Sequence, residues 1–286
     1  MSVDDPSKGR TPAENAELAL LLEVAGTPKP GNVDRERDLE DLRFEHFLAG
    51  AVGARRGLEA AAAGAPVGQA FERAVSGMSG QSGGNTQFGA LLLLTPLVKA
   101  ASERELTPTG VTVIAETTTV EDAAAFYRAF EHVDVFVGDR PKDASAPDVE
   151  KGADAVDEIR EEGLTMYEVL AQTPGENGIS DEYTGGFRRT FEAADQLRSL
   201  SGPVTARAAA TYLDLLAEAP DALVARRKGE GVARQVMVRA QEAREGDLAH
   251  VRAFSEALVR EGINPGATAD LVVAGLFVAL ERGLEV

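Results

Sequence analysis

The stretch SGQSGGNTQFGALLLLTP, residues 79–96, determines how we expect the chain to fold. It begins with small and polar residues and continues as an apolar run with almost no polar face. A helix that is apolar on all sides belongs in the interior of a protein. Because about 20 apolar residues are needed to cross a bilayer, this run is too short for a membrane span. We therefore predict a buried central helix over about residues 87–100.

The loop that leads into this helix consists of Gly83, Gly84, Asn85 and Thr86. Asn85 and Thr86 are typical N-cap residues, and the glycines let the backbone approach another group closely. The free N–H groups and the positive dipole end of a helix N-terminus favour a phosphate or a carboxylate. No Lys-Ser or Lys-Thr pair follows the glycines, so this is not a Walker-type phosphate loop. At this point an anion site and a tight turn that only feeds a core helix are both open.

Helical signals extend over the rest of the chain. Thr11-Pro12-Ala13-Glu14 and Thr165-Met166-Tyr167-Glu168 have the pattern of capping boxes. Residues 264–270 lead into a second apolar helix over about residues 268–281. The short apolar run 110–115 does not separate a strand from a helix. We predict an all-α fold, a single-domain multi-helix bundle over residues 11–286, preceded by a disordered tail of residues 1–10.

The charge and the rare residue types limit the function. The 286 residues include no cysteine and three histidines, and the net charge is −18. Any metal would therefore be a hard cation on oxygen ligands, Mg²⁺ first. The acidic residues are spread over the whole chain, which is typical of a salt-adapted surface and argues against nucleic-acid binding. With no signal peptide or membrane segment visible, we expect a cytoplasmic protein without a membrane partner.

Polar and charged side chains gather in constrained loops and at helix ends. The first cluster is Glu23, Lys29, Asn32, Asp34, Arg35 and Asp41; the second is Gly83 to Thr86; the third is Asp221, Arg226, Arg227 and Lys228; and Asp270 stands beside them. Carboxylates for Mg²⁺, cations for phosphate oxygens and helix N-termini are the groups that a nucleoside triphosphate requires. A surface ion pair is the simpler alternative for any one of them.

The segment between these clusters is expected to be a helix that starts near Asp38 or Asp41. Phe44, Phe47 and Leu48 begin its apolar stripe, and His46 falls outside that stripe. We therefore expect His46 on the surface.

The sequence resembles the triphosphoribosyl-dephospho-CoA synthase family from about Leu18 to Ala279. The matching residues are Glu23, Thr27-Pro28-Lys29-Pro30-Gly31, Asp34-Arg35, Gly83-Gly84-Asn85-Thr86, Asp221, Arg226 with Gly229, Pro265-Gly266 and Ala269-Asp270-Leu271. The chain departs from the family's citrate and malonate enzymes at three places. They commonly have His at the position of Leu39, His-Lys at Gln87-Phe88, and Asp-Thr at Asp221-Ala222. The sequence looks closer to an archaeal branch of the family.

The resemblance implies an all-α enzyme in which dephospho-CoA attacks the ribose C1′ of ATP, with adenine released and the triphosphate retained. For this reaction we assign three sets of site residues. Catalysis would fall to Asp41 and Asp270; nucleotide and phosphate binding to Lys29, Asn32, Arg35, Gly83, Gly84, Asn85, Thr86 and Arg226; and Mg²⁺ to Glu23, Asp34 and Asp221.

Two other functions stay open at this stage. One is a nucleotide or ADP-ribose hydrolase that uses the same carboxylates, and the other is a non-catalytic nucleotide-binding regulatory protein. The expected partners are ATP and dephospho-CoA or a similar alcohol acceptor, and a homodimer is left open.

Overall fold

The computed structural model describes residues 9–136, 145–173 and 178–286. These residues contain fifteen α-helices, one 3-10 helix and no strand, only a single isolated bridge between Asp34 and Arg37. The predicted all-α fold is confirmed, and the undecided run 110–115 lies in a helix, α5 (Pro108–Glu116). Residues 1–8 of the predicted tail lie outside the described residues.

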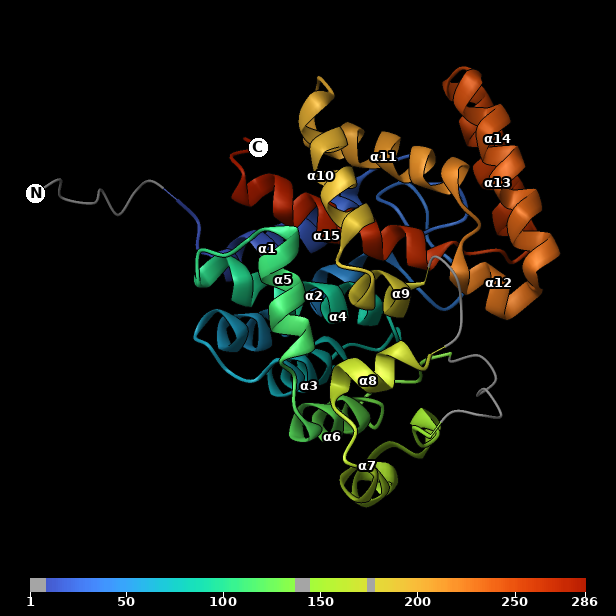
Figure 1. The fold of residues 1–286 in the computed structure, drawn as a ribbon. Helices are drawn as coiled ribbons and strands as arrows, with labels where there is room; N and C mark the ends of the chain where they lie inside the picture. The colour runs from blue at the N-terminus through green and yellow to red at the C-terminus, as the bar shows by residue number, and fades with distance from the viewer. Residues whose placement is uncertain (1–8, 137–144, 174–177) are drawn as a thin grey trace, which may run out of the picture.

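The helices of the first half are α1 (Pro12–Ala25), α2 (Phe44–Ala62), α3 (Val67–Met78), α4 (Phe88–Ser102), α5 and α6 (Val120–Ala129). After them come η1 (Val149–Ala155), α7 (Val156–Glu162), α8 (Met166–Ala171), α9 (Ile179–Thr184) and α10 (Arg188–Ser199). The last helices are α11 (Val204–Glu218), α12 (Ala222–Lys228), α13 (Glu230–Glu245), α14 (Leu248–Arg260) and α15 (Gly266–Glu281). Figure 1 shows α4 and α15 in the middle of the molecule and α13 and α14 as a pair at one side.

The two apolar helices form the centre of the core, as predicted. Almost every residue of α4 and α15 is buried, and the two helices pack against each other. Their N-terminal ends meet, because a Cβ atom on Gly89 would collide with Oδ2 of Asp270. A glycine is therefore required at position 89 for the first turn of α4 to approach Asp270 in the N-terminal part of α15.

The start of α2 corrects two expectations. The helix begins at Phe44, because the segment before it forms a separate turn in which Asp38 accepts a hydrogen bond from the Phe44 N–H at 2.8 Å. His46 is only 8% exposed, so its predicted surface position is wrong. The glycine loop covers it: Gly83 packs directly on the imidazole, and the Ser82 hydroxyl lies 3.4 Å from Nε2.

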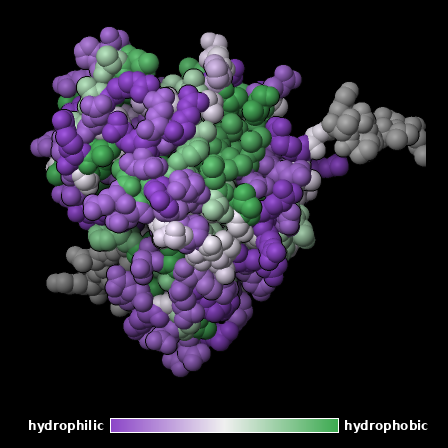
Figure 2. Space-filling view, turned by 180° about the vertical axis from the view of Figure 1, so that it is seen from behind, coloured by the Kyte–Doolittle hydropathy of each residue, from purple (hydrophilic) through white to green (hydrophobic). Residues whose placement is uncertain are grey.

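One large hydrophobic cluster contains buried side chains from Ala13 to Leu284, so the helices share a common core. Whether the chain forms one domain stays a prediction. Within the described residues no helix combines the length and the apolar character that a membrane span needs. Seen from behind, most of the surface is hydrophilic, and hydrophobic residues gather in one stretch of it (Figure 2).

Candidate active site

A cavity of about 250 Å³ lies where the first turns of α4 and α15 meet the loop after α1 and the helix α12. Its polar lining includes Glu23, Asn32, Asn85, Thr86, Arg226, Asn264 and Asp270. Its aromatic lining includes Phe47, Phe88, Phe126, Tyr127, Phe130 and Phe136. The cavity thus combines charged and polar side chains with aromatic ones, as a site for a phosphorylated organic molecule requires.

The loop after α1 is shaped by Asp34. One carboxylate oxygen accepts hydrogen bonds from the Thr27 hydroxyl and the Lys29 N–H, both at 3.0 Å. The other oxygen accepts from the Glu36 N–H at 2.9 Å. Asp34 lines a small surface hollow and not the cavity. In this structure its carboxylate therefore holds the loop together.

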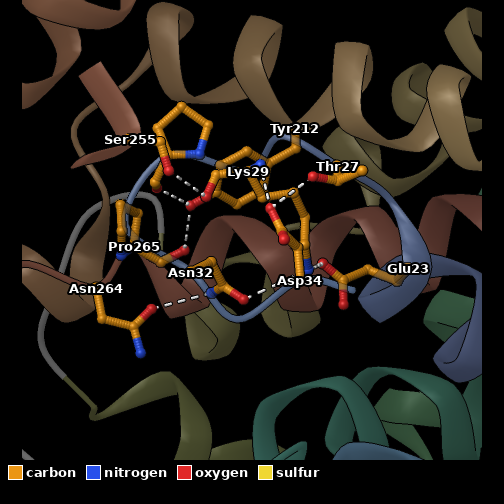
Figure 3. A network of polar contacts seen from close by, with 10 residues as sticks. Glu23, Thr27, Lys29, Asn32, Asp34, Tyr212, Ser255, Asn264 and Pro265 are labelled. Atoms are coloured by element: carbon orange, nitrogen blue, oxygen red, sulfur yellow. Dashed lines mark hydrogen bonds and ion pairs between the residues drawn. The ribbon is translucent and has the colours of Figure 1, made fainter. Parts of the chain in front are cut away.

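This loop packs tightly against the connection between α14 and α15. Gly31 has a φ of +76°, and a Cβ atom there would collide with the carbonyl oxygen of Ile263. The Tyr212 hydroxyl donates to the carbonyl oxygen of Pro30 at 2.9 Å, and it lies 3.4 Å from that of Pro265. Tyr212 thereby holds together two segments that are far apart in sequence (Figure 3).

Lys29 is fully buried, and its ammonium forms an ion pair with Glu23. The same ammonium lies 3.4 Å from Oδ1 of Asn32 and 5.9 Å from the centre of the Tyr212 ring. Burial raises the pKa of Glu23, and the positive charge of Lys29 opposes that rise. Lys29 does not line the cavity, whereas Glu23 does.

Asp270 is the fifth residue of α15, at the start of its second turn, and lines the cavity. The surrounding protein removes water from its carboxyl group and raises the pKa well above its usual range. The negative charges of Glu23 and Asp221 act in the same direction, and a hydrogen bond from the Ala90 N–H of α4 opposes it. A carboxyl group in this position can hold a proton near neutral pH and give it to a bound molecule.

Asp221 caps α12 and ties it to α15. One of its oxygens accepts from the N–H groups of Leu223 and Val224 at 2.9 and 3.0 Å. The other accepts from the N–H and the hydroxyl of Thr268 at 2.8 and 2.7 Å. Burial raises the pKa of Asp221, and these four hydrogen bonds oppose the rise. Both oxygens are thus already bonded within the protein, and Asp221 does not line the cavity.

Replacing Asp221 by asparagine is therefore expected to destabilise the fold. The amide keeps an oxygen for α12 but turns an NH₂ group toward the Thr268 N–H, so a charge-assisted bond is replaced by two opposed donors. We expect the free energy of unfolding to fall by about 2–4 kcal/mol in urea denaturation. Asp247, an exposed cap of α14, is the matched control. Asp247→Asn should change stability by less than about 0.5 kcal/mol, because Asn caps as well as Asp. An equal loss of stability in both variants would contradict a stabilising role for the hydrogen bonds between Asp221 and Thr268 of α15.

Arg226 brings positive charge to the cavity. Its Nε is buried and has no hydrogen-bond partner among the described residues. Loss of water around the guanidinium lowers its pKa, although Asp221 opposes that shift. Its neighbour Arg227 also lines the cavity and lies over the ring of Phe136 at 5.3 Å. A half-buried guanidinium whose Nε has no partner among the described residues is suited to an anionic ligand.

The structure brings six of the predicted site residues to this one cavity: Glu23, Asn32, Asn85, Thr86, Arg226 and Asp270. Lys29 and Asp221 lie directly behind it, bonded to groups at its wall. Arg35 and Asp41 are exposed and outside the lining, and so is Gly84. Gly83 packs on His46 instead. The roles assigned to these residues stay predictions.

The sequence did not predict the aromatic lining of the cavity or the positions of Gln87 and Phe88 in its wall. Phe88 stands where the family's citrate and malonate enzymes have a basic residue, and its ring packs edge-on against Phe71 and Phe130, with centres 5.0 Å apart. Gln87 is 3% exposed, and its amide has no hydrogen-bond partner among the described residues. That the side-chain amide of Gln87 is buried without a partner among the described residues can be recognised only from the three-dimensional structure.

The fold and the cavity define an all-α enzyme whose site combines carboxyl groups with a guanidinium that forms no ion pair among the described residues. The family profile for ATP:dephospho-CoA triphosphoribosyl transferase matches residues 9–285, and the chain belongs to this family. The chain is also similar to the crystal structure of a protein from Archaeoglobus fulgidus assigned as a triphosphoribosyl-dephospho-CoA synthase. The TM-score is 0.68 and the identity 26%, over 84% of this chain and 100% of that one. A comparison with curated proteins finds no match.

These findings confirm the predicted family and enzyme class, a transferase of triphosphoribosyl groups from ATP. The alternatives of a hydrolase and of a regulatory protein are not favoured.

Proposed function

We propose that this cavity binds ATP with the ribose C1′ next to Asp270 and passes the triphosphoribosyl group to a hydroxyl of dephospho-CoA or a similar alcohol. The observation that supports this most is the position of Asp270. It is a carboxyl group with a raised pKa at the meeting point of two helix N-termini, in a cavity that also contains Arg226. Charged and polar groups thus surround the point where the glycosidic bond would lie.

Asp270 can serve both halves of the reaction. In its protonated form it gives a proton to adenine as the C1′–N bond breaks, which makes the base a better leaving group. The carboxylate that results then accepts the proton of the attacking hydroxyl as the C1′–O bond forms. One proton passes from the acceptor to adenine, and Asp270 returns to its starting state. The carboxylate also stabilises the positive charge that develops at C1′, as in glycoside chemistry.

The triphosphate would lie at the end of the cavity that holds Arg226. The first turns of α4 and α15 add the positive ends of two helix dipoles there. Asn85 accepts a hydrogen bond from the N–H of Phe88, the first residue of α4, at 3.1 Å, so its amide NH₂ stays available to a ligand.

Replacing Arg226 by glutamine should therefore weaken ATP binding about 10- to 100-fold, the size of one lost charge-assisted hydrogen bond. Titration calorimetry with ATP and Mg²⁺ measures this directly. Arg234 is an exposed arginine of α13, and Arg234→Gln serves as the control with an expected change below about 2-fold. Unchanged ATP affinity in Arg226→Gln would place the triphosphate elsewhere.

Mg²⁺ is the metal that we propose to accompany ATP. Of the three predicted ligands only Glu23 lines the cavity, and a carboxylate is the type of ligand that a hard cation prefers. Asp34 and Asp221, the other predicted ligands, direct their oxygens to protein N–H and hydroxyl groups. The described residues contain no group of three or more acidic or histidine side chains arranged around one point. A metal here would therefore be bound largely through the phosphates and water, and it would neutralise phosphate charge.

The proposed function is tested by incubating the protein with ATP, Mg²⁺ and dephospho-CoA, followed by mass spectrometry. A transferase gives free adenine and an adduct that contains the acceptor plus triphosphoribose. Adenine together with free ribose triphosphate, with or without an acceptor, would instead indicate a hydrolase. The absence of adenine release with a panel of alcohol acceptors would leave nucleotide binding alone and contradict the proposal.

A further inference from the structure

Asn264 carries an amide that faces the cavity and that neither the sequence motifs nor the comparisons assign. It lies immediately before Pro265 and α15, and it is partly exposed in the cavity wall. Its Oδ1 accepts a hydrogen bond from Nδ2 of Asn32 at 2.9 Å. This is the only hydrogen bond of the Asn264 side chain to the described residues.

The orientation of both amides follows from Lys29. An ammonium group has only donors, so the atom of Asn32 that faces it must be the oxygen, at 3.4 Å. The Asn32 NH₂ then points away from Lys29 and must find an acceptor, which is the oxygen of Asn264. The chain of contacts from Glu23 through Lys29 and Asn32 thus leaves the NH₂ group of Asn264 pointing away from Asn32, without a partner among the described residues (Figure 3).

The surroundings of this NH₂ group favour an anion. Gly266 and Ala267, at the start of the 16-residue helix α15, line the same cavity, and Arg226 with its unpartnered Nε lies in the same wall. A helix N-terminus, an amide donor and a guanidinium together form the donor set that phosphate oxygens accept from. Glu23 and Asp270 also line the cavity, but Glu23 is paired with Lys29.

We infer that Asn264 is a phosphate-binding residue of this site, which donates its amide N–H groups to the triphosphate of the nucleotide, and that Lys29 and Asn32 are positioning residues that hold its amide in the donating orientation. This inference rests on the proposed function, because it takes ATP as the ligand. It assigns Lys29 an indirect role: the lysine acts through two amides and does not touch the phosphate.

The substitution Asn264→Asp separates this role from a structural one. The aspartate still accepts the hydrogen bond from Asn32, but it replaces the donor on the cavity side by a negative oxygen. We expect ATP affinity to fall by at least about 50-fold in Asn264→Asp and about 10-fold in Asn264→Ala. Adenosine, which has no phosphate, should bind to all three proteins within about 2-fold. Gln69→Glu adds the same charge at an exposed position of α3, and it should leave both affinities unchanged.

Titration calorimetry with ATP and with adenosine measures these affinities. ATP affinity in Asn264→Asp equal to that of the wild type would overturn the inference, and so would an equal loss of ATP and adenosine, which would indicate a damaged cavity. In both cases the proposed function stands if the wild-type protein still binds ATP and releases adenine. A wild-type protein that binds neither ligand would overturn the proposed function itself.

Discussion

Replacing Asp270 by asparagine is expected to lower the rate of triphosphoribosyl transfer by about 10²- to 10⁴-fold, the contribution of a positioned acid or base. Asparagine fills the same space but can neither give a proton to adenine nor accept one from the attacking hydroxyl. ATP should still bind, because the triphosphate contacts assigned to Arg226 and Asn264 are unchanged. The loss should therefore appear in kcat and not in the affinity for ATP.

The raised pKa of Asp270 determines how both the stability and the activity of the protein should change with pH. Because the folded protein holds this proton more tightly than the unfolded chain does, stability falls as the pH rises from the unfolded pKa through the folded pKa. An asparagine at this position would carry no such charge, so Asp270→Asn should melt at the same or a higher temperature at neutral pH. Wild-type activity should decrease above the raised pKa, where Asp270 has lost the proton that the leaving adenine needs.

Asp41 is the control for this experiment, because it is exposed and lies outside the cavity lining. Asp41→Asn should retain activity within about 2-fold, as for a solvated surface carboxylate. A severe loss of kcat in Asp41→Asn together with an active Asp270→Asn would reverse the catalytic assignment.

Replacing Lys29 by methionine is expected to destabilise the protein by about 3–5 kcal/mol, the effect of removing one partner from a buried ion pair. Lys29 is fully buried, and its ammonium compensates the carboxylate of Glu23, which is 2% exposed. Methionine fills the space but leaves a buried charge unpaired. The melting temperature should fall by roughly 6–20 °C for a chain of this size.

The double variant Glu23→Gln/Lys29→Met distinguishes an unpaired charge from poor packing. It removes both charges, so most of the lost stability should return. Arg160 and Glu121 form an exposed pair, and Arg160→Met should cost less than about 1 kcal/mol. A double variant no more stable than Lys29→Met would show that the loss comes from the shape of the site and not from the charge of Glu23.

The fold could be predicted because its signals are local. The capping box of Thr11 and Glu14 is present in the structure, as is that of Thr165 and Glu168. The two apolar runs are buried helices because no orientation would have given them a polar face. The start of α2 was missed because the Asp38 side chain reaches six residues ahead to the Phe44 N–H, which a capping pattern does not describe.

The site could be predicted in part. The sequence places Glu23, Asn32, Arg226 and Asp270 at helix ends or in a constrained loop, and all four line one cavity. Their partners could not be read from the sequence, because they come from distant elements. The pairing of Asp221 with Thr268, 47 positions away, is an example. A lysine in a stiff loop looks available to a phosphate until the fold turns its ammonium toward Glu23.

The aromatic lining of the cavity could not be predicted for a related reason. Its rings come from α2, α4 and α6 and from the segment before residue 137, and each one alone looks like an ordinary core residue. Only the packing of these elements places Phe88, Phe126 and Phe130 around one space.

The most direct measurement is a crystal structure of Asp270→Asn soaked with ATP and Mg²⁺, since slow turnover should keep the nucleotide intact. We predict ATP in the cavity, with its triphosphate within hydrogen-bond distance of Arg226 and of the Asn264 NH₂ group and its ribose C1′ beside residue 270. The aromatic residues would then surround the remaining space, where the acceptor enters. ATP bound outside this cavity, or bound within it with the triphosphate away from Arg226 and Asn264, would contradict the account.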